Sequence, residues 1–154
     1  MEKIKIGFAS DHRGYELKEK LIEYFKKQSD ILDITDCGTN SKDSVDYPDY
    51  AYLLGKEIES KDIDFGIAIC GSGIGISIAL NKMKGVYCAK VNNALEARYT
   101  RLDNNTNAVS FSGDTSFDEA LKIVDTFIHT DFSNEERHLK RINKVKKIEE
   151  NNYD

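Results

Sequence analysis

One segment of the chain places a thiol beside a glycine-rich turn. Cys70 ends the apolar run 65–70, the turn at 71–75 reads Gly-Ser-Gly-Ile-Gly, and residues 76–83 are again mostly apolar. This order predicts a buried strand, a tight loop and a helix. Backbone N–H groups at the start of such a helix stabilise a phosphate or a developing oxyanion, and they favour the thiolate form of a cysteine. The segment therefore offers a proton acceptor together with an electrostatic stabiliser.

The glycine turn does not match the common nucleotide-binding motifs. No Gly-Lys-Ser/Thr sequence closes it, as a Walker A loop requires, and its spacing is GxGxG rather than GxGxxG. A tight strand-to-helix turn is the simpler interpretation of such a loop. Three glycines in five residues after a buried strand exceed what a simple turn needs, and they favour anion binding.

A second polar cluster, Asp11-His12, follows the first predicted strand. In isolation the pair could be a turn-forming aspartate beside a surface histidine. The carboxyl ends of parallel strands meet at one edge of a sheet, however, and Cys70 also ends a strand. Two polar clusters at one sheet edge predict a ligand site there.

A third cluster lies on the last predicted helix, 134–150. Arg137 and Arg141 are i,i+4 neighbours with His138 beside them, and two arginines on one face can grip a phosphate. A solvated charged face fits the same spacing. The apolar residues of this helix form one narrow stripe that needs a partner surface, in this subunit or in another. That stripe consists of Leu139, Ile142, Val145 and Ile148.

Short apolar segments alternate with helical patterns about five times. Such alternation predicts an α/β fold, a parallel sheet covered by helices on both faces. Strands are predicted at 4–10, 31–34, 63–70, 85–91 and 108–111. Helices are predicted around 17–25, 51–58, 76–83, 94–102, 117–128 and 134–150, with a polar loop over 36–49.

Size and composition exclude several classes of protein. The 154 residues suit one domain, expected over 1–150, with the helix 134–150 packed on a partner subunit. A net charge of −5 argues against nucleic-acid binding, and no apolar run reaches the length of a membrane span. The first residues lack a signal-peptide core, so we expect a cytoplasmic protein. Three widely spaced cysteines without a CxxC pair argue against structural zinc and a disulfide framework.

Taken together, these motifs resemble the ribose 5-phosphate isomerase B family, which also includes the galactose 6-phosphate isomerase subunits. The resemblance covers roughly residues 3–150, and the segment Cys-Gly-Ser-Gly-Ile-Gly-Ile-Ser is its most specific part. The matching segments are 9–12, 38–39, 46–48, 70–77, 81–82, 104–107 and 137–138 with Arg141.

The resemblance implies a Rossmann-like, flavodoxin-like α/β/α sandwich with a five-stranded parallel sheet. It also implies a homodimer or tetramer in which a neighbouring subunit completes each active site, with no metal and no cofactor. The expected reaction interconverts ribose 5-phosphate and ribulose 5-phosphate through a cis-enediolate, with Cys70 as the base. Backbone amides from Ser72 to Ile76 would stabilise the enediolate oxyanion.

The family's functional residues can be placed on this sequence one by one. Asp11 and Tyr47 would hold sugar hydroxyls, His12 would face the phosphate, and the partner chain would contribute Arg137 and Arg141. The residues expected to contact or convert the substrate are Asp11, His12, Tyr47, Cys70, Gly71, Ser72, Gly73, Gly75, Asp103, Asn104, Arg137, His138 and Arg141.

Two departures from the family pattern leave alternatives open. Asp103 stands where the ribose branch usually carries the histidine that opens the furanose ring, so Asp103, His138 or His12 would perform that step. Gly113-Asp114 stands where an arginine often lies near the phosphate. The alternatives to a pentose phosphate isomerase are an isomerase of a hexose phosphate or another sugar, and a non-catalytic sugar-phosphate-binding homologue.

Overall fold

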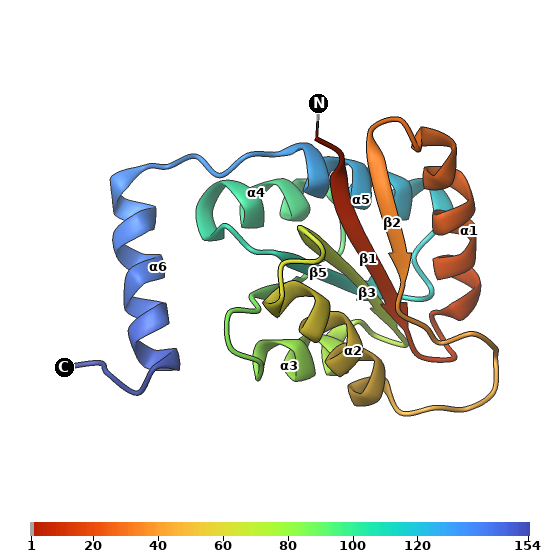
Figure 1. Ribbon diagram of the computed structural model, residues 1–154, viewed down its shortest axis with the longest axis horizontal. Coiled ribbons are helices and arrows are strands. Elements are labelled where there is room, and N and C mark those ends of the chain that lie inside the picture. The colour runs from red at the N-terminus through yellow and green to blue at the C-terminus, as the bar shows by residue number, and fades with distance from the viewer. Residues whose placement is uncertain (1) are drawn as a thin grey trace.

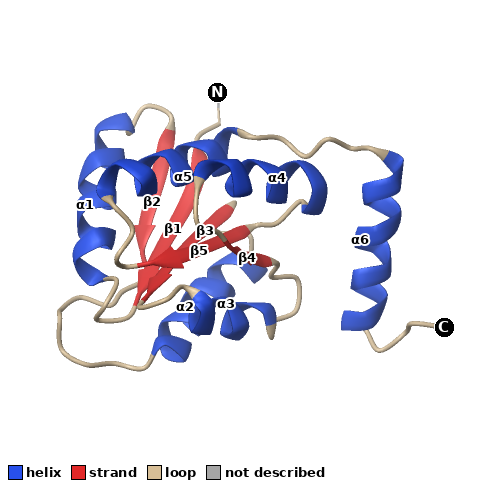
Figure 2. Ribbon diagram, turned by 180° about the vertical axis from the view of Figure 1, so that it is seen from behind, coloured by secondary structure: helices blue, strands red, loops and turns tan. Residues whose placement is uncertain are grey.

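The fold is a central parallel sheet between two layers of helices. The computed structural model describes residues 2–154, and Figures 1 and 2 show it from opposite sides. The strands are β1 (Ile4–Ser10), β2 (Leu32–Asp36), β3 (Phe65–Cys70), β4 (Cys88–Lys90) and β5 (Ala108–Ser112). The helices are α1 (Tyr15–Phe25), the short 3₁₀ turn η1 (Lys26–Gln28), α2 (Tyr47–Glu59), α3 (Ile74–Asn81), α4 (Ala94–Asn104), α5 (Phe117–His129) and α6 (Glu136–Glu149).

All strand pairs are parallel, and their order across the sheet is β2-β1-β3-β5-β4. The α/β sandwich with a five-stranded parallel sheet, predicted from the sequence, is confirmed. After β1 the chain turns to one side of the sheet to form β2, and after β3 it continues on the other side. The carboxyl ends of β1 and β3 therefore flank the point where the strand order reverses, which is where open α/β sheets bind ligands.

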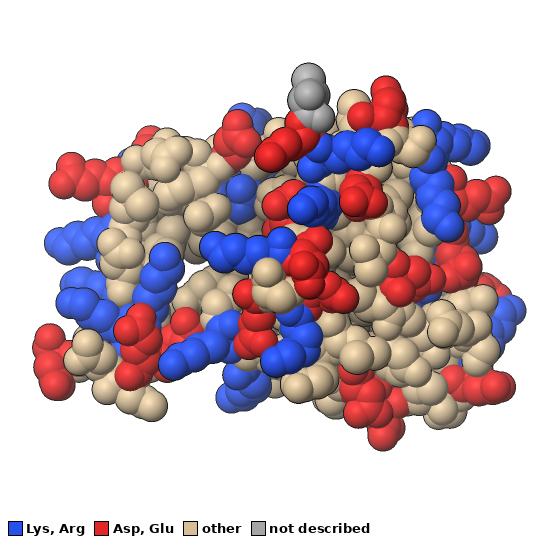
Figure 3. Space-filling view, in the orientation of Figure 1, with Lys and Arg blue, Asp and Glu red and all other residues tan. Residues whose placement is uncertain are grey.

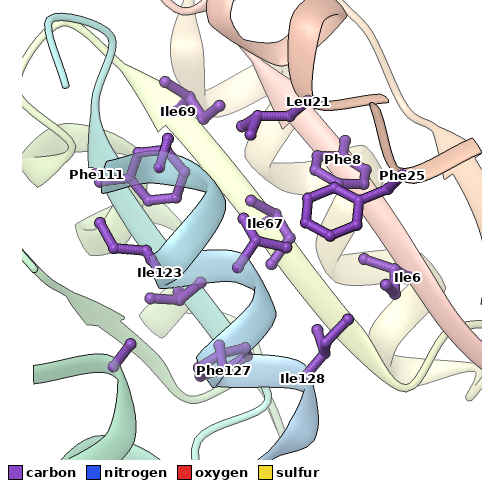
Figure 4. Packing of buried hydrophobic residues seen from close by; sticks show 14 of the residues in the cluster. Ile6, Phe8, Leu21, Phe25, Ile67, Ile69, Phe111, Ile123, Phe127 and Ile128 are labelled. Carbon is purple, nitrogen blue, oxygen red and sulfur yellow. The ribbon is translucent and has the colours of Figure 1, made fainter. Parts of the chain in front are cut away.

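Each face of the sheet has its own apolar core. On one face, α1 and α5 bury large side chains against β1, β3 and β5; Figure 4 shows Phe8, Phe25, Ile67 and Phe127 packed together there. On the other face, α2 and α3 cover smaller residues, including Ala68 and Cys70. Burial of a large apolar side chain stabilises the fold by about 1.5–3 kcal/mol, so the two layers hold the sheet edge rigid.

Several element boundaries differ from the sequence prediction. The polar loop predicted to Asp49 is too long, because α2 already begins at Tyr47 with Pro48 in its first turn, where a missing N–H costs nothing. The predicted strand 85–91 shrinks to Cys88–Lys90. There the Val86 N–H bonds to the Met83 carbonyl and the Tyr87 N–H to the Asn107 side chain, so neither joins the ladder. Strand β3 likewise starts at Phe65 rather than at residue 63.

Helix α6 stands apart from the three layers. In Figures 1 and 2 it lies on the opposite side of the molecule from the arrowheads of β1 and β3. Its C-terminal end is held by Glu149, which accepts hydrogen bonds from the Gly85 N–H at 2.8 Å and the Tyr87 hydroxyl at 3.0 Å. A cavity of about 590 Å³ separates α6 from the ends of α2 and α4, and Leu139, Val145 and Ile148 are exposed on α6.

The charged surface over α6 mixes both signs. Figure 3 shows Lys and Arg side chains of this region interspersed with Asp and Glu, without a continuous basic face in that view. No helix within residues 2–154 is long and apolar enough to cross a membrane.

Candidate active site

Cys70 lies at the carboxyl end of β3, with its side chain buried under the glycine turn. The residue is 3 % exposed, and the Gly73 N–H donates to its Sγ at 3.2 Å. Because Gly73 is the N-cap of α3, the sulfur faces the positive end of that helix. The structure thus brings the thiol and the helix start into direct contact, as the order strand, turn, helix predicts.

The other two cysteines lie in different surroundings. Burial raises the pKa of the Cys88 thiol to about 11, and burial together with Glu57 and Asp36 raises that of Cys37 to about 11. Both remain neutral thiols at physiological pH.

The glycine turn needs glycine at its third position. Gly73 has a φ of +79°, and a Cβ there would lie 2.6 Å from the carbonyl carbon of Phe111 on β5. Two serines of β5 hold the turn from beneath. Ser110 Oγ donates to the Gly73 carbonyl at 2.7 Å, and Ser112 Oγ donates to the Gly71 carbonyl at 2.6 Å.

The serine contacts fix which way the peptide groups of the turn point. With the Gly71 and Gly73 carbonyls bonded to β5, the turn exposes N–H groups on its open side. The Ile74 N–H donates a hydrogen bond to Ser72 Oγ at 3.1 Å. The Gly75 and Ile76 N–H groups belong to the first turn of α3, where no intrahelical acceptor exists. These two amides are placed to receive a developing negative charge.

Asp11 and His12 lie on the same edge, next to β3. The Asp11 N–H bonds to the Ile69 carbonyl at 3.2 Å, and Asp11 Oδ1 accepts from the Arg13 and Gly14 N–H groups at 2.9 and 3.2 Å. His12 Nδ1 accepts from the Val45 N–H at 3.2 Å. That nitrogen therefore carries no proton in this arrangement, and the Nε2–H of a neutral imidazole is left as a donor.

Tyr47 packs on the glycine turn that follows Cys70. Its ring covers Gly75, because a Cβ at Gly75 would lie 2.7 Å from the ring carbon Cζ. The start of α2 at Tyr47, which the sequence prediction placed in a loop, is what positions this ring. The structure thus brings together the predicted site residues Asp11, His12, Tyr47, Cys70, Gly71, Ser72, Gly73 and Gly75.

The remaining predicted residues gather elsewhere, where α4 meets α6. His138 is largely buried, and its Nε2 lies 3.3 Å from Asp103 Oδ1 and 3.3 Å from Glu135 Oε2, without the alignment of a hydrogen bond. Arg137 forms an ion pair with Glu135 at 2.9 Å. Asn104 lines the cavity beside α6 together with Asp64, which directly precedes β3.

The two groups occupy opposite edges of the sheet. Asn104 lies near the amino end of β3, whereas Cys70 is at its carboxyl end, and six strand residues span roughly 16 Å. Within one chain, the structure does not bring Asp103, Asn104 or His138 to Cys70. Within one subunit the predicted site residues therefore form two separate groups, one at each edge of the sheet.

Sequence reasoning missed the two serines of β5. The signal that could have revealed them is their spacing: Ser110 and Ser112 are two residues apart in a strand, so they share a face. A buried hydroxyl on a core strand needs a hydrogen-bond acceptor, and the carbonyls of the glycine turn provide one. Among residues 2–154, no three His, Cys, Asp or Glu side chains converge as ligands for a metal.

Comparisons with known proteins identify the family to which the chain belongs. The model of the Ribose/Galactose Isomerase family matches residues 6–145. Ribose-5-phosphate isomerase B of Escherichia coli is 33% identical over 147 residues, covering 95% of this chain and 97% of the relative. The chain therefore belongs to the ribose/galactose isomerase family.

Solved structures show the same fold over nearly the whole chain. Ribose-5-phosphate isomerase B of Clostridium thermocellum superimposes with a TM-score of 0.92 at 39% identity, covering 96% of this chain and 99% of that one. The Mycoplasma genitalium enzyme, solved with bound ribulose-5-phosphate, superimposes with a TM-score of 0.89 at 35% identity. That match covers 97% of this chain and 99% of the other.

Proposed function

We propose that this member of the ribose/galactose isomerase family interconverts ribose 5-phosphate and ribulose 5-phosphate. The observation that carries the proposal is the contact of Cys70 Sγ with the start of α3, beside the Gly75 and Ile76 amides. The similar structure from Mycoplasma genitalium was solved with ribulose-5-phosphate bound, which supports a pentose phosphate as the substrate of this chain. Isomerisation needs a base and an oxyanion stabiliser at adjacent carbons, and this edge of the sheet provides both.

In the proposed mechanism Cys70 is the proton carrier. Its thiolate removes the proton from C2 of the open-chain aldose, and the electron pair moves to give a cis-enediolate whose oxyanion is held by the Gly75 and Ile76 amides. The hydroxyl proton passes from O2 to O1 within the cis-enediolate, which moves the negative charge to O2. The Cys70 thiol then returns its proton to C1 as the C2 carbonyl forms, which yields the ketose and regenerates the thiolate. Asp11 and Tyr47 hold sugar hydroxyls, and His12 donates from Nε2 toward the phosphate.

A second copy of the chain would complete the site. Asn104 and α6 line a cavity at the amino end of β3, whereas their own subunit's Cys70 ends that strand. Three large apolar side chains of α6 are exposed. In a two-fold symmetric dimer, the α4–α6 corner of each subunit would cover the carboxyl edge of the other. The partner's residues Arg137 and Arg141 would then bind the phosphate.

Ring opening would fall to the partner's α4–α6 corner. His138 lies beside Asp103, and an imidazole is a better proton donor at neutral pH than an exposed carboxylate. We therefore assign ring opening to His138, with Asp103 holding it in place. The three free cysteines support a reducing compartment, and we place the reaction in the cytoplasm.

A panel of aldose phosphates tests the proposed function. The purified protein is incubated with ribose 5-phosphate and, separately, with hexose phosphates, and the ketose formed is quantified. We expect the highest kcat/KM for ribose 5-phosphate. A hexose phosphate as the best substrate would move the protein to the other branch of the family. Turnover of no sugar phosphate, with binding retained, would indicate a non-catalytic homologue.

A further inference from the structure

Arg13 extends across the glycine turn at the mouth of the site. A Cβ on Gly71 would lie 2.7 Å from Arg13 Cζ and 3.0 Å from its Nε, so the guanidinium rests directly on that glycine. The backbone of Arg13 also lies against Gly113, the residue that follows β5 and Ser112. One residue thus links the loop after β1 to the loops after β3 and β5.

The Arg13 guanidinium has no anionic partner in the part of the chain described here. Over residues 2–154, no carboxylate oxygen lies within 4.0 Å of it, and the residue is exposed. Nearby lysines differ in this respect. Lys18 is buried and paired with Asp36 at 2.8 Å, and Lys42 is paired with Glu16.

The subunit offers few other positive charges to a phosphate at this edge. His12 accepts a hydrogen bond at Nδ1, so it contributes a donor rather than a full charge. The loop after β5 contributes Asp114, which is an anion. Lys90 ends the outermost strand β4, with β5 between it and Cys70, and it is bonded to Asn92. Arg13 is therefore the subunit's unpaired cation in contact with the glycine turn.

We propose that Arg13 binds the phosphate group of the substrate, an inference that rests on the proposed sugar-phosphate chemistry of the same site. Cys70 and Asp11 are buried, whereas Arg13 is exposed at the rim. A substrate with its reacting carbons at Cys70 therefore extends its far end toward Arg13. The planar guanidinium can meet two phosphate oxygens at once, and such charge-assisted bonds are about twice as strong as neutral ones.

Binding of a ligand that cannot react separates this inference from catalysis. Ribitol 5-phosphate has no carbonyl group, so its affinity is measured by calorimetry whether or not the protein is an isomerase. Arg13→Met removes the positive charge, and Arg13→Lys keeps the charge but loses the planar guanidinium that can bond two phosphate oxygens at once. Lys27→Met removes a charge at the opposite edge of the sheet and is the matched control. Inorganic phosphate is the second probe.

We expect the Kd of ribitol 5-phosphate to rise at least about tenfold in Arg13→Met, a few-fold in Arg13→Lys and not at all in Lys27→Met. Inorganic phosphate should follow the same order, and the three melting temperatures should agree within a few degrees. A Kd within twofold of wild type in Arg13→Met would overturn the inference. Equal losses of affinity in Arg13→Met and Arg13→Lys, together with a lowered Tm, would also overturn it, because Arg13 would then only support the turn. Undetectable binding of ribitol 5-phosphate to the unaltered protein would overturn it as well. Arg13-dependent binding without turnover would support the inference while the isomerase function failed.

Discussion

At the scale of single residues, surroundings decide which of three cysteines can do chemistry. Cys70 receives an N–H bond from Gly73 at a helix start, whereas burial holds the pKa of both Cys37 and Cys88 near 11. The residue type is the same in each case. Cys70 is set apart by the Gly73 N–H, which the glycine turn directs toward its sulfur.

Replacing the sulfur of Cys70 should remove catalysis and leave binding. In Cys70→Ala we expect kcat to fall by about three orders of magnitude or more, because no other group nearby can move the proton between C2 and C1. The Kd for ribitol 5-phosphate should change by less than about threefold. Cys37→Ala is the control and should keep wild-type activity. A Cys70→Ala enzyme with near-normal kcat would exclude Cys70 as the base.

The conformation of Gly73 gives a second test at this scale. Gly73 and Gly85 both have a φ near +80°, but a Cβ meets the Phe111 backbone only at Gly73, and nothing lies within 4 Å at Gly85. Gly85→Ala should destabilise the protein by about 1 kcal/mol from its backbone conformation alone. Gly73→Ala should cost clearly more in urea unfolding, and it should lower kcat because the turn must shift. Equal losses in stability would show that the steric contact has no effect.

At the scale of elements, the sequence predicted the types and order of the strands and helices, and the edge that carries Cys70 and Asp11. Periodicity and glycine placement suffice for that, because each is a local property. Boundaries that depend on distant partners were not predictable in this way. The start of α2 at Tyr47 and the short β4 depend on contacts with Gly75 and with Asn107, which lie far along the chain.

The separation of the two halves of the site could not be read from residue spacing; only the family resemblance implied that a partner chain contributes Arg137 and Arg141. Spacing along α6 shows that Arg137 and Arg141 share a face, but it does not show which edge of the sheet that face approaches. The tie between Glu149 and the Gly85–Tyr87 segment sets the position of α6. These hydrogen bonds place α6 at the edge of the sheet opposite Cys70, and they cannot be read from the sequence.

The corner between α4 and α6 carries a prediction about ring opening. His138→Asn should slow turnover of ribose 5-phosphate by about 10²-fold, because the cyclic sugar must open before C2 can react. It should affect a four-carbon aldose phosphate far less, since that substrate cannot form the ring. Asp103→Asn should show the same pattern with a smaller loss, while His12 variants should not. Equal losses on both substrates at all three positions would rule out this division of labour.

At the scale of the whole molecule, buried thiols link stability to pH. The Cys88 thiol keeps its proton up to a pKa of about 11 in the folded protein, whereas an unfolded cysteine loses it near pH 9. Its contribution to stability is therefore complete below about pH 9 and is lost as the pH rises through 11.

This linkage can be measured by urea unfolding at several pH values. We expect the free energy of unfolding to decline between pH 9 and 11, by up to roughly 2 kcal/mol from Cys88. In Cys88→Ala the protein should be less stable at pH 8 but should decline less steeply. Cys37, whose pKa is also raised to about 11, contributes to the remaining slope. Parallel pH profiles for wild type and Cys88→Ala would contradict the assignment.

In the assembled molecule, we propose that each active site joins Cys70 of one subunit to α6 of another. Cys70→Ala and Arg137→Ala subunits should each be nearly inactive as homo-oligomers, because every site lacks one half. When the two kinds of subunit are partially unfolded, mixed and refolded together, they form hybrid dimers. In each hybrid, one of the two sites has both of its halves unaltered. A random mixture would place about half of all dimers in this hybrid form, so activity should return to roughly a quarter of wild type.

Subunit mixing is the most direct test of shared sites, since activity returns only if residues of two subunits form one site. The control mixes Cys70→Ala with Asp11→Ala subunits. Both changes fall on the same half of the site, so each of the two sites in a hybrid carries one of them and activity should stay at background. Recovery to roughly a quarter of wild type in the first mixture alone is the predicted result. No recovery in either mixture, or full activity in an isolated monomer, would contradict the account.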